Sequence, residues 1–134
     1  MGDIVVRDDS YLGYLHIYNT SGNRWRYNRC RVFWGSCLIG VANDGSYIIS
    51  SNNDKKLYKY TFWGDELSSV DISHDGPVYD VYVDDHDVIF VCLDDNVIIY
   101  DKTGKQISLL STDRQIEPSS VFVDRNRQIF VCDY

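Results

Sequence analysis

Two segments of this chain repeat the same pattern of residues at a fixed distance. Val83-Asp84 is followed after four residues by Ile89-Phe90-Val91-Cys92, and 40 positions further on Val123-Asp124 is followed in the same way by Ile129-Phe130-Val131-Cys132. A repeat of about 40 residues indicates stacked supersecondary units, each of which buries its apolar face against its neighbours. The repeat constrains the fold more than any single residue does. It constrains the function less, because such scaffolds carry many unrelated activities.

The segments between turn residues are short, and none keeps a 3.6-residue apolar period over ten residues. We therefore predict strands and no helix. The strands predicted for a second unit are Cys37–Ala42, Tyr47–Ser51, Leu57–Phe62 and Leu67–Ile72, and those for a third unit are Val78–Val83, Val88–Leu93, Val97–Asp101 and Gln106–Leu110. The second strand of the third unit is apolar throughout, which predicts burial on both faces.

Both ends of the chain hold incomplete units. The N-terminal strands predicted are Ile4–Val6, Tyr14–Tyr18 and Trp25–Arg31, and the C-terminal ones are Ser120–Val123 and Ile129–Cys132. The predicted division of this single domain is an incomplete first unit at 1–36, a second at 37–76, a third at 77–117 and an incomplete fourth at 118–134.

Four-stranded antiparallel meanders of this length, repeated around an axis, are the blades of a β-propeller. The predicted fold is therefore all-β, with about three such blades of ~40 residues. Closed propellers have about four to eight blades, so this number cannot close a ring. Edge strands such as Ile129–Cys132 would then stay open to pairing. Either the chain is part of a longer propeller, or copies of it associate and complete one another.

Several residues resemble the motifs of known propeller repeats. His74-Asp75-Gly76-Pro77-Val78, with Tyr100-Asp101 and Thr103-Gly104-Lys105 after it, resembles a WD repeat in which Tyr-Asp replaces Trp-Asp. Asp54 and Asp94, six residues before Tyr60 and Tyr100, resemble the turn aspartate of that family. The last unit departs from the WD pattern, with Glu117-Pro118 in place of a Gly-His. Its Pro118-Ser119-Ser120-Val121-Phe122-Val123-Asp124, followed by Ile129-Phe130-Val131-Cys132-Asp133-Tyr134, is more similar to an NHL repeat. The WD resemblance implies structural roles for six residues, with the histidine bonded to a turn aspartate: His74, Asp54, Asp94, Tyr60, Tyr100 and Asp101.

Composition argues against several classes of function. A net charge of -7 and a pI near 4.7 repel phosphate backbones, so nucleic-acid binding is not favoured. The N-terminal residues are charged and no apolar run is long enough to span a membrane, so we expect a soluble cytoplasmic protein with no membrane contact. The four cysteines form no zinc pattern with the histidines, and we interpret Cys92 and Cys132 as small core residues. We expect no metal and no cofactor.

One segment is a candidate binding strand. It interleaves arginines with aromatic residues: Arg24, Trp25, Arg26, Tyr27, Arg29, Arg31 and Trp34. Arginine pairs with carboxylates and phosphates, and aromatic rings stack on bases. The same alternation is typical of a half-buried outer strand. A structural strand, a patch for a protein or an acidic ligand, and an RNA site therefore remain open interpretations.

Catalytic motifs are missing from the sequence. The acidic turns at Asp84, Asp85, Asp87, Asp94 and Asp95 lack the spacing of a calcium loop, and Asp and Asn favour turns in any case. No nucleophile elbow or catalytic triad is visible. We therefore predict a non-catalytic protein–protein interaction scaffold, not an enzyme, whose partners are another protein, further copies of the chain, or both. The alternatives are an NHL-like RNA-binding module using the Arg24–Arg31 strand and a metal-dependent propeller hydrolase or lyase using the acidic turns.

Overall fold

The computed structural model describes residues 4–7, 14–29, 37–51, 55–111 and 116–133, without the side chains of residues 4, 7, 14, 15, 25–29 and 37. Every regular element in these ranges is a β-strand. Within them, no helix is long and apolar enough to cross a membrane. The predicted all-β class is confirmed.

The strands form four antiparallel sheets, which we call sheets 1 to 4. Sheet 1 contains β1 (Ile4–Arg7), β2 (Tyr14–Tyr18) and β3 (Arg24–Arg29); sheet 2 contains β4 (Cys37–Val41), β5 (Tyr47–Ser51), β6 (Lys56–Tyr60) and β7 (Glu66–Asp71); sheet 3 contains β8 (Asp80–Val83), β9 (Ile89–Cys92), β10 (Val97–Tyr100) and β11 (Gln106–Leu110); sheet 4 contains β12 (Pro118–Val123) and β13 (Ile129–Asp133). Within each sheet the strands follow one another in chain order as a meander.

The strand boundaries differ from the predicted ones by one or two residues at several ends. One such shift is at β8, which starts at Asp80 although its apolar run starts at Val78. Val78 is buried in the connection before the strand, in the cluster between sheets 2 and 3. The apolar character of Val78 therefore reflects its burial between the sheets and not a place in a strand.

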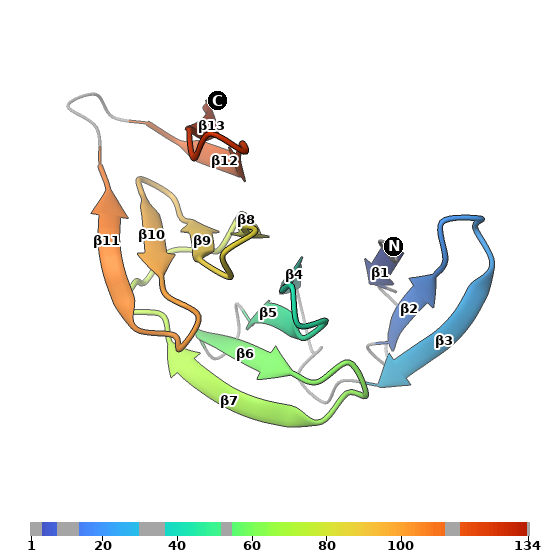
Figure 1. The fold of residues 1–134 in the computed structure, drawn as a ribbon. Coiled ribbons are helices and arrows are strands. Elements are labelled where there is room, and N and C mark those ends of the chain that lie inside the picture. The colour runs from blue at the N-terminus through green and yellow to red at the C-terminus, as the bar shows by residue number, and fades with distance from the viewer. Residues whose placement is uncertain (1–3, 8–13, 30–36, 52–54, 112–115, 134) are drawn as a thin grey trace.

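The four sheets lie around a common centre as an open arc (Figure 1). β4 and β8 lie on the inner side of the arc, and β7 and β11 lie on its outer side. Neighbouring sheets touch through their inner strands, β4 with β8 and β8 with β12. The sheets therefore do not surround their common centre on all sides.

Apolar clusters between successive sheets hold the arc together. In β9, Ile89 and Val91 belong to the cluster shared with sheet 2, whereas Phe90 and Cys92 belong to the cluster shared with sheet 4. This is the two-face alternation of a strand, here with both faces buried. All four residues of β9 are buried, so the predicted burial on both faces is confirmed. Between sheets 1 and 2, Ile17 of β2 anchors the corresponding cluster.

Six hairpin turns share one geometry, which explains the turn residues in the sequence. In each, the N–H of the first turn residue donates to the carbonyl of the fifth, and the N–H of the fourth donates to the carbonyl of the first. The fourth residue has a positive φ, and these residues are Gly22, Gly45, Gly64, Asp87, Gly104 and Arg127. This is the three-residue hairpin with a type I turn and a bulge, which favours glycine at the fourth position.

Candidate functional site

The candidate binding strand is only partly described. Arg24 begins β3, is exposed, and its Nη1 lies 3.3 Å from Nδ1 of His16. Arg31 and Trp34 lie outside the described residues, and so do the side chains of Trp25, Arg26, Tyr27 and Arg29. The RNA-binding interpretation depends on these arginines, so it stays a prediction.

His74 lies between a backbone amide and a turn carboxylate. The N–H of Gly76 donates to Nδ1 of His74 at 2.9 Å, which leaves Nε2 as the protonated nitrogen of a neutral ring. Nε2 lies 3.3 Å from Oδ1 of Asp95. The contacted carboxylate is therefore one residue after Asp94, the aspartate that the repeat spacing selects. The carboxylate of Asp94 instead lies against Gly76, where a Cβ would come within 2.5 Å of Oδ2.

Asp101 stabilises the turn that follows the third strand of sheet 3. Its Oδ1 accepts hydrogen bonds from the backbone N–H groups of Thr103 and Lys105 and from the Thr103 hydroxyl. The Thr103 hydroxyl, together with these amides, lowers the pKa of the Asp101 carboxyl. Tyr100, just before it, is buried, and so is Tyr60. Asp54 lies outside the described residues.

Sequence reasoning missed two equivalents of Asp101. Asn19 and Thr61 follow Tyr18 and Tyr60, and each accepts two backbone N–H bonds in the same turn. The signal was present as Tyr-Asn, Tyr-Thr and Tyr-Asp at spacings of 42 and 40 residues.

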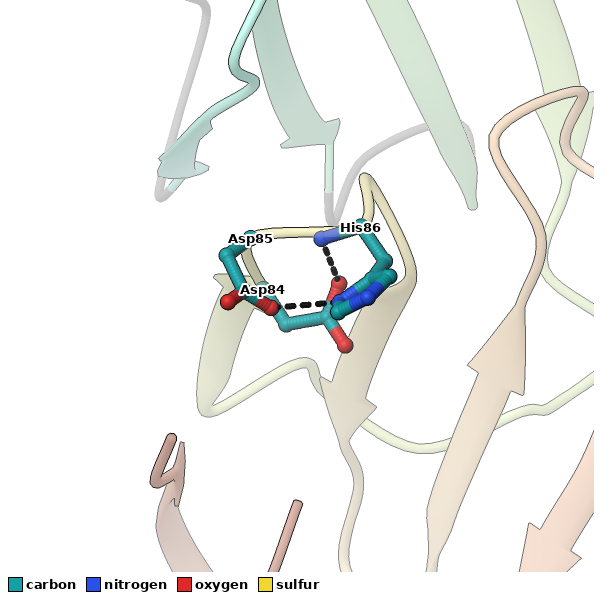
Figure 2. Close-up of side chains that lie close together, drawn as sticks. All are labelled: Asp84, Asp85 and His86. Carbon is teal, nitrogen blue, oxygen red and sulfur yellow. Dashed lines mark hydrogen bonds and ion pairs between the residues drawn. The ribbon is translucent and has the colours of Figure 1, made fainter. Parts of the chain in front are cut away.

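Asp84, Asp85 and His86 bring three possible metal-ligating atoms within 4.8 Å of one another (Figure 2). Oδ1 of Asp84 accepts the N–H groups of His86 and Val88, and Oδ1 of Asp85 lies 2.5 Å from Nδ1 of His86. Asp124 makes the same pair of turn bonds one repeat later, in a turn with neither an acidic residue nor a histidine beside it. The position of Asp84 therefore follows from the turn alone.

Polar side chains also join one sheet to the next. Asn43 donates from its backbone N–H to Oδ1 of Asp87 and from Nδ2 to the carbonyl of Asp85, both at 2.7 Å. Asp80, half-buried at the start of β8, accepts on Oδ2 the hydroxyl of Ser120 at 2.7 Å and the N–H of Val121 at 3.0 Å. Sequence reasoning missed both residues. For Asp80, the available signal was a charged residue directly before an apolar run.

Comparisons with known proteins bear on this architecture. No family model matches the chain, and no curated protein matches it. Several solved structures match nearly all of it. Among them are a protein of unknown function from Bacteroides caccae, with a TM-score of 0.83 at 14% identity over 99% of this chain, and the WD40 β-propeller domain of Doa1, with 0.74 at 18% over 98%. Virginiamycin B lyase from Staphylococcus aureus matches with 0.75 at 11% over 98%.

The chain has the β-propeller fold. It spans about half of these structures, covering 53% of the Bacteroides protein, 43% of the Doa1 domain and 45% of the lyase. Sheets 1 to 4 are thus the blades of a partial propeller. At these identities the likeness carries the fold alone, and the three proteins include both a WD40 domain and an enzyme.

The last blade of this partial propeller leaves an aromatic face uncovered. Phe122 and Phe130 are each 53% exposed, and their rings lie 6.4 Å apart. Cys132 on the same strand is exposed as well, so the interpretation of Cys132 as a core residue is wrong, whereas Cys92 is buried as predicted. Cys132 matches the position of Cys92 one repeat earlier, but no described part of this chain covers it.

Proposed function

We propose that this chain forms about half of a β-propeller whose completed form is a non-catalytic scaffold for protein–protein interaction. Residues 1–36, 37–76, 77–117 and 118–134 are its successive units. Completion comes from self-association or from a longer parent chain. WD-like and NHL-like features both occur in the repeats, and WD40 propellers are one class of protein with this fold.

The observation that carries this proposal is that several carboxylates and one histidine hold the turns and blades together. Asp84, Asp101 and Asp124 accept the amides of their own turns. Asp80 accepts a hydroxyl and an amide of the next blade, and His74 is held between an amide and a carboxylate. Each of these groups has a structural partner among the described residues, which supports a role in the fold.

The proposed binding surface combines the arginine-rich strand with exposed aromatic residues. Trp63 stands in the turn between β6 and β7 and is largely exposed, with its ring edge-on to Phe62 at 5.6 Å. Large exposed aromatic side chains and arginines dominate the binding energy of protein interfaces. Arg24 at the start of β3 is the described residue of the arginine-rich strand that supports this role.

Crosslinking of the tagged chain in cells of its native source, followed by mass spectrometry, tests the proposal. We expect a protein partner other than the chain itself, and we expect its recovery to fall with Trp63→Ser or Arg24→Ala. Ile107→Ser, at an exposed apolar residue of β11, is the matched control and should leave recovery unchanged. Recovery of no protein beyond the chain itself would remove the scaffold function.

A metal-dependent hydrolase or lyase is the second candidate. The observation that favours it is the buried Oδ2 of Asp84, which has no hydrogen-bond partner among the described residues and lies 3.9 Å from Nη2 of Arg127. Calcium and magnesium prefer such carboxylate oxygens. Under this alternative, added calcium or magnesium raises the unfolding temperature of the chain but not that of Asp85→Asn. An unchanged unfolding temperature in both proteins rejects it.

A further inference from the structure

Two exposed apolar sites lie at the two ends of the arc, and the repeat shows what should cover them. Phe90 occupies the position of Phe130 one repeat earlier and is only 3% exposed, because sheet 4 covers it. Tyr82, the equivalent of Phe122, packs in the same cluster. The 53% exposure of Phe122 and Phe130 therefore marks an inter-blade face without its next blade.

At the opposite end of the arc, an apolar residue is exposed although its equivalent in another sheet is buried. Val41 on β4 is 46% exposed, whereas Val123, at the same position in sheet 4, is 7% exposed. Ile39, two residues before Val41 and hence on the same face, packs in the cluster with Ile17 of sheet 1. Val41 thus faces the place where sheet 1, with three strands among the described residues, has no innermost strand.

The residues equivalent to Phe122 and Val41 contact each other at the two junctions between sheets 2 and 3 and between sheets 3 and 4. Between sheets 2 and 3, a Cβ on Gly40 would lie 2.6 Å from Cγ2 of Val83. Between sheets 3 and 4, the hydroxyl of Tyr82 donates to the carbonyl of Val123 at 3.2 Å. Gly40, Tyr82 and Phe122 are equivalent positions on one face. On the other face, Val83 and Val123 are equivalent to Val41, so the next pair in the series is Phe122 with Val41.

We propose that Phe122 and Phe130 of one copy pack over Val41 of a second copy, so that two chains close one propeller. Sheet 4 of each copy then supplies β12 as the innermost strand that sheet 1 of the other copy lacks, and β13 takes the place of β1, its equivalent in the repeat, beside β2. β1 and β13 are both edge strands in the described sheets, and both are short and apolar. Open apolar edges of this kind pair readily with another strand. This inference rests on the half-propeller of the proposed function and names what completes it.

A second copy fits better than an unrelated protein for two reasons. The proposed contact continues the two inter-blade contacts that the chain already makes. The chain also covers 43% of the WD40 β-propeller domain of Doa1, so two copies supply most of one ring. A head-to-tail contact gives a closed assembly when the rotation between copies completes a circle. Two half-rings meet that condition with two identical junctions.

The test measures mass in solution for two charge variants and for their mixture. Phe122→Lys and Val41→Glu should each reduce the mass from twice 15.5 kDa to that of a single chain. Mixing the two variants should restore the double mass, because one junction then pairs Lys with Glu and the other retains Phe with Val. Ile107→Lys, at a residue of similar exposure away from both ends, should stay double. Circular dichroism of each variant verifies folding, and Val41→Glu replaces a side chain that is already half exposed.

The outcomes separate this inference from the proposed function. A single-chain mass for the unaltered protein, or a mixture that stays at single mass, overturns the inference. A monomer that still binds a different protein leaves the scaffold function standing without the two-chain ring. A restored double mass without any other protein partner supports the ring and removes the scaffold function.

Discussion

Replacement of Asp80 by alanine should separate the last blade from the one before it. Oδ2 of Asp80 accepts the hydroxyl of Ser120 at 2.7 Å and the N–H of Val121 at 3.0 Å. Val121 is buried, so its N–H finds no water once the carboxylate is removed, whereas the half-buried Ser120 hydroxyl can turn to solvent. A buried donor left without an acceptor costs about 1–3 kcal/mol. We expect Asp80→Ala to destabilise the native state by about 2 kcal/mol.

Urea denaturation combined with amide hydrogen exchange measures this effect at fixed protein concentration. Exchange at Val121 should accelerate about 30-fold, which corresponds to the same free energy. Asp80→Asn keeps an acceptor oxygen and should lose less than Asp80→Ala. Asp71→Ala is the control, because its ion pair with Lys56 at 3.5 Å is exposed, and such pairs contribute about 0.2–1 kcal/mol. If Asp80→Ala behaves like this control, or if Val121 exchanges as before, the inter-blade role of Asp80 is wrong.

The remaining predictions concern a turn glycine, an acidic turn and a thiol. Gly104→Ala should lower the free energy of unfolding in urea more than Gly45→Ala does. Both glycines have a positive φ, but only at Gly104 would a Cβ overlap a methyl group of β7. Equal losses of free energy in the two variants would contradict this. The Thr103 hydroxyl lowers the pKa of the Asp101 carboxyl, so the ionised carboxylate stabilises the fold at pH values above the ordinary carboxyl pKa of 3.8. This stabilisation is lost as the pH falls through the lower native pKa. The urea midpoints of wild type and Asp101→Asn should therefore converge on acidification, and a constant gap between them rejects the assignment. Burial raises the pKa of the Cys92 thiol to about 12, so iodoacetamide should label it at pH 8 only after unfolding, and peptide-resolved labelling of the native chain would disprove this.

The sequence carried most of the information on the blades because their determinants are local. Alternating apolar residues define strands such as Gln106–Leu110, and Asp, Asn and Gly define the turns between them. Strand ends were less predictable, since Val78 is apolar for burial in a connection and not for pairing. The repeat matched Cys132 to Cys92 and so predicted burial for both, but Cys132 is exposed because no described blade follows its own.

The contacts between blades could not be read in the same way. Asp80 bonds Val121 and Asn43 bonds Asp87, each across about one repeat of sequence. A residue's type does not reveal that its partner lies one blade away. His74 is an intermediate case. Its contact with a turn carboxylate agrees with the WD resemblance, but the carboxylate is that of Asp95 and not of Asp94. The sequence does not show which of two adjacent aspartates in a turn points toward the histidine.

Sedimentation equilibrium of the unaltered chain over a range of concentrations is the most direct test of the half-propeller. The account predicts a mass that rises from 15.5 kDa to twice that value and then stays constant, because a ring of two copies leaves no open end. A mass that remains at 15.5 kDa at every concentration, or one that grows without limit as the ends add further copies, would contradict it.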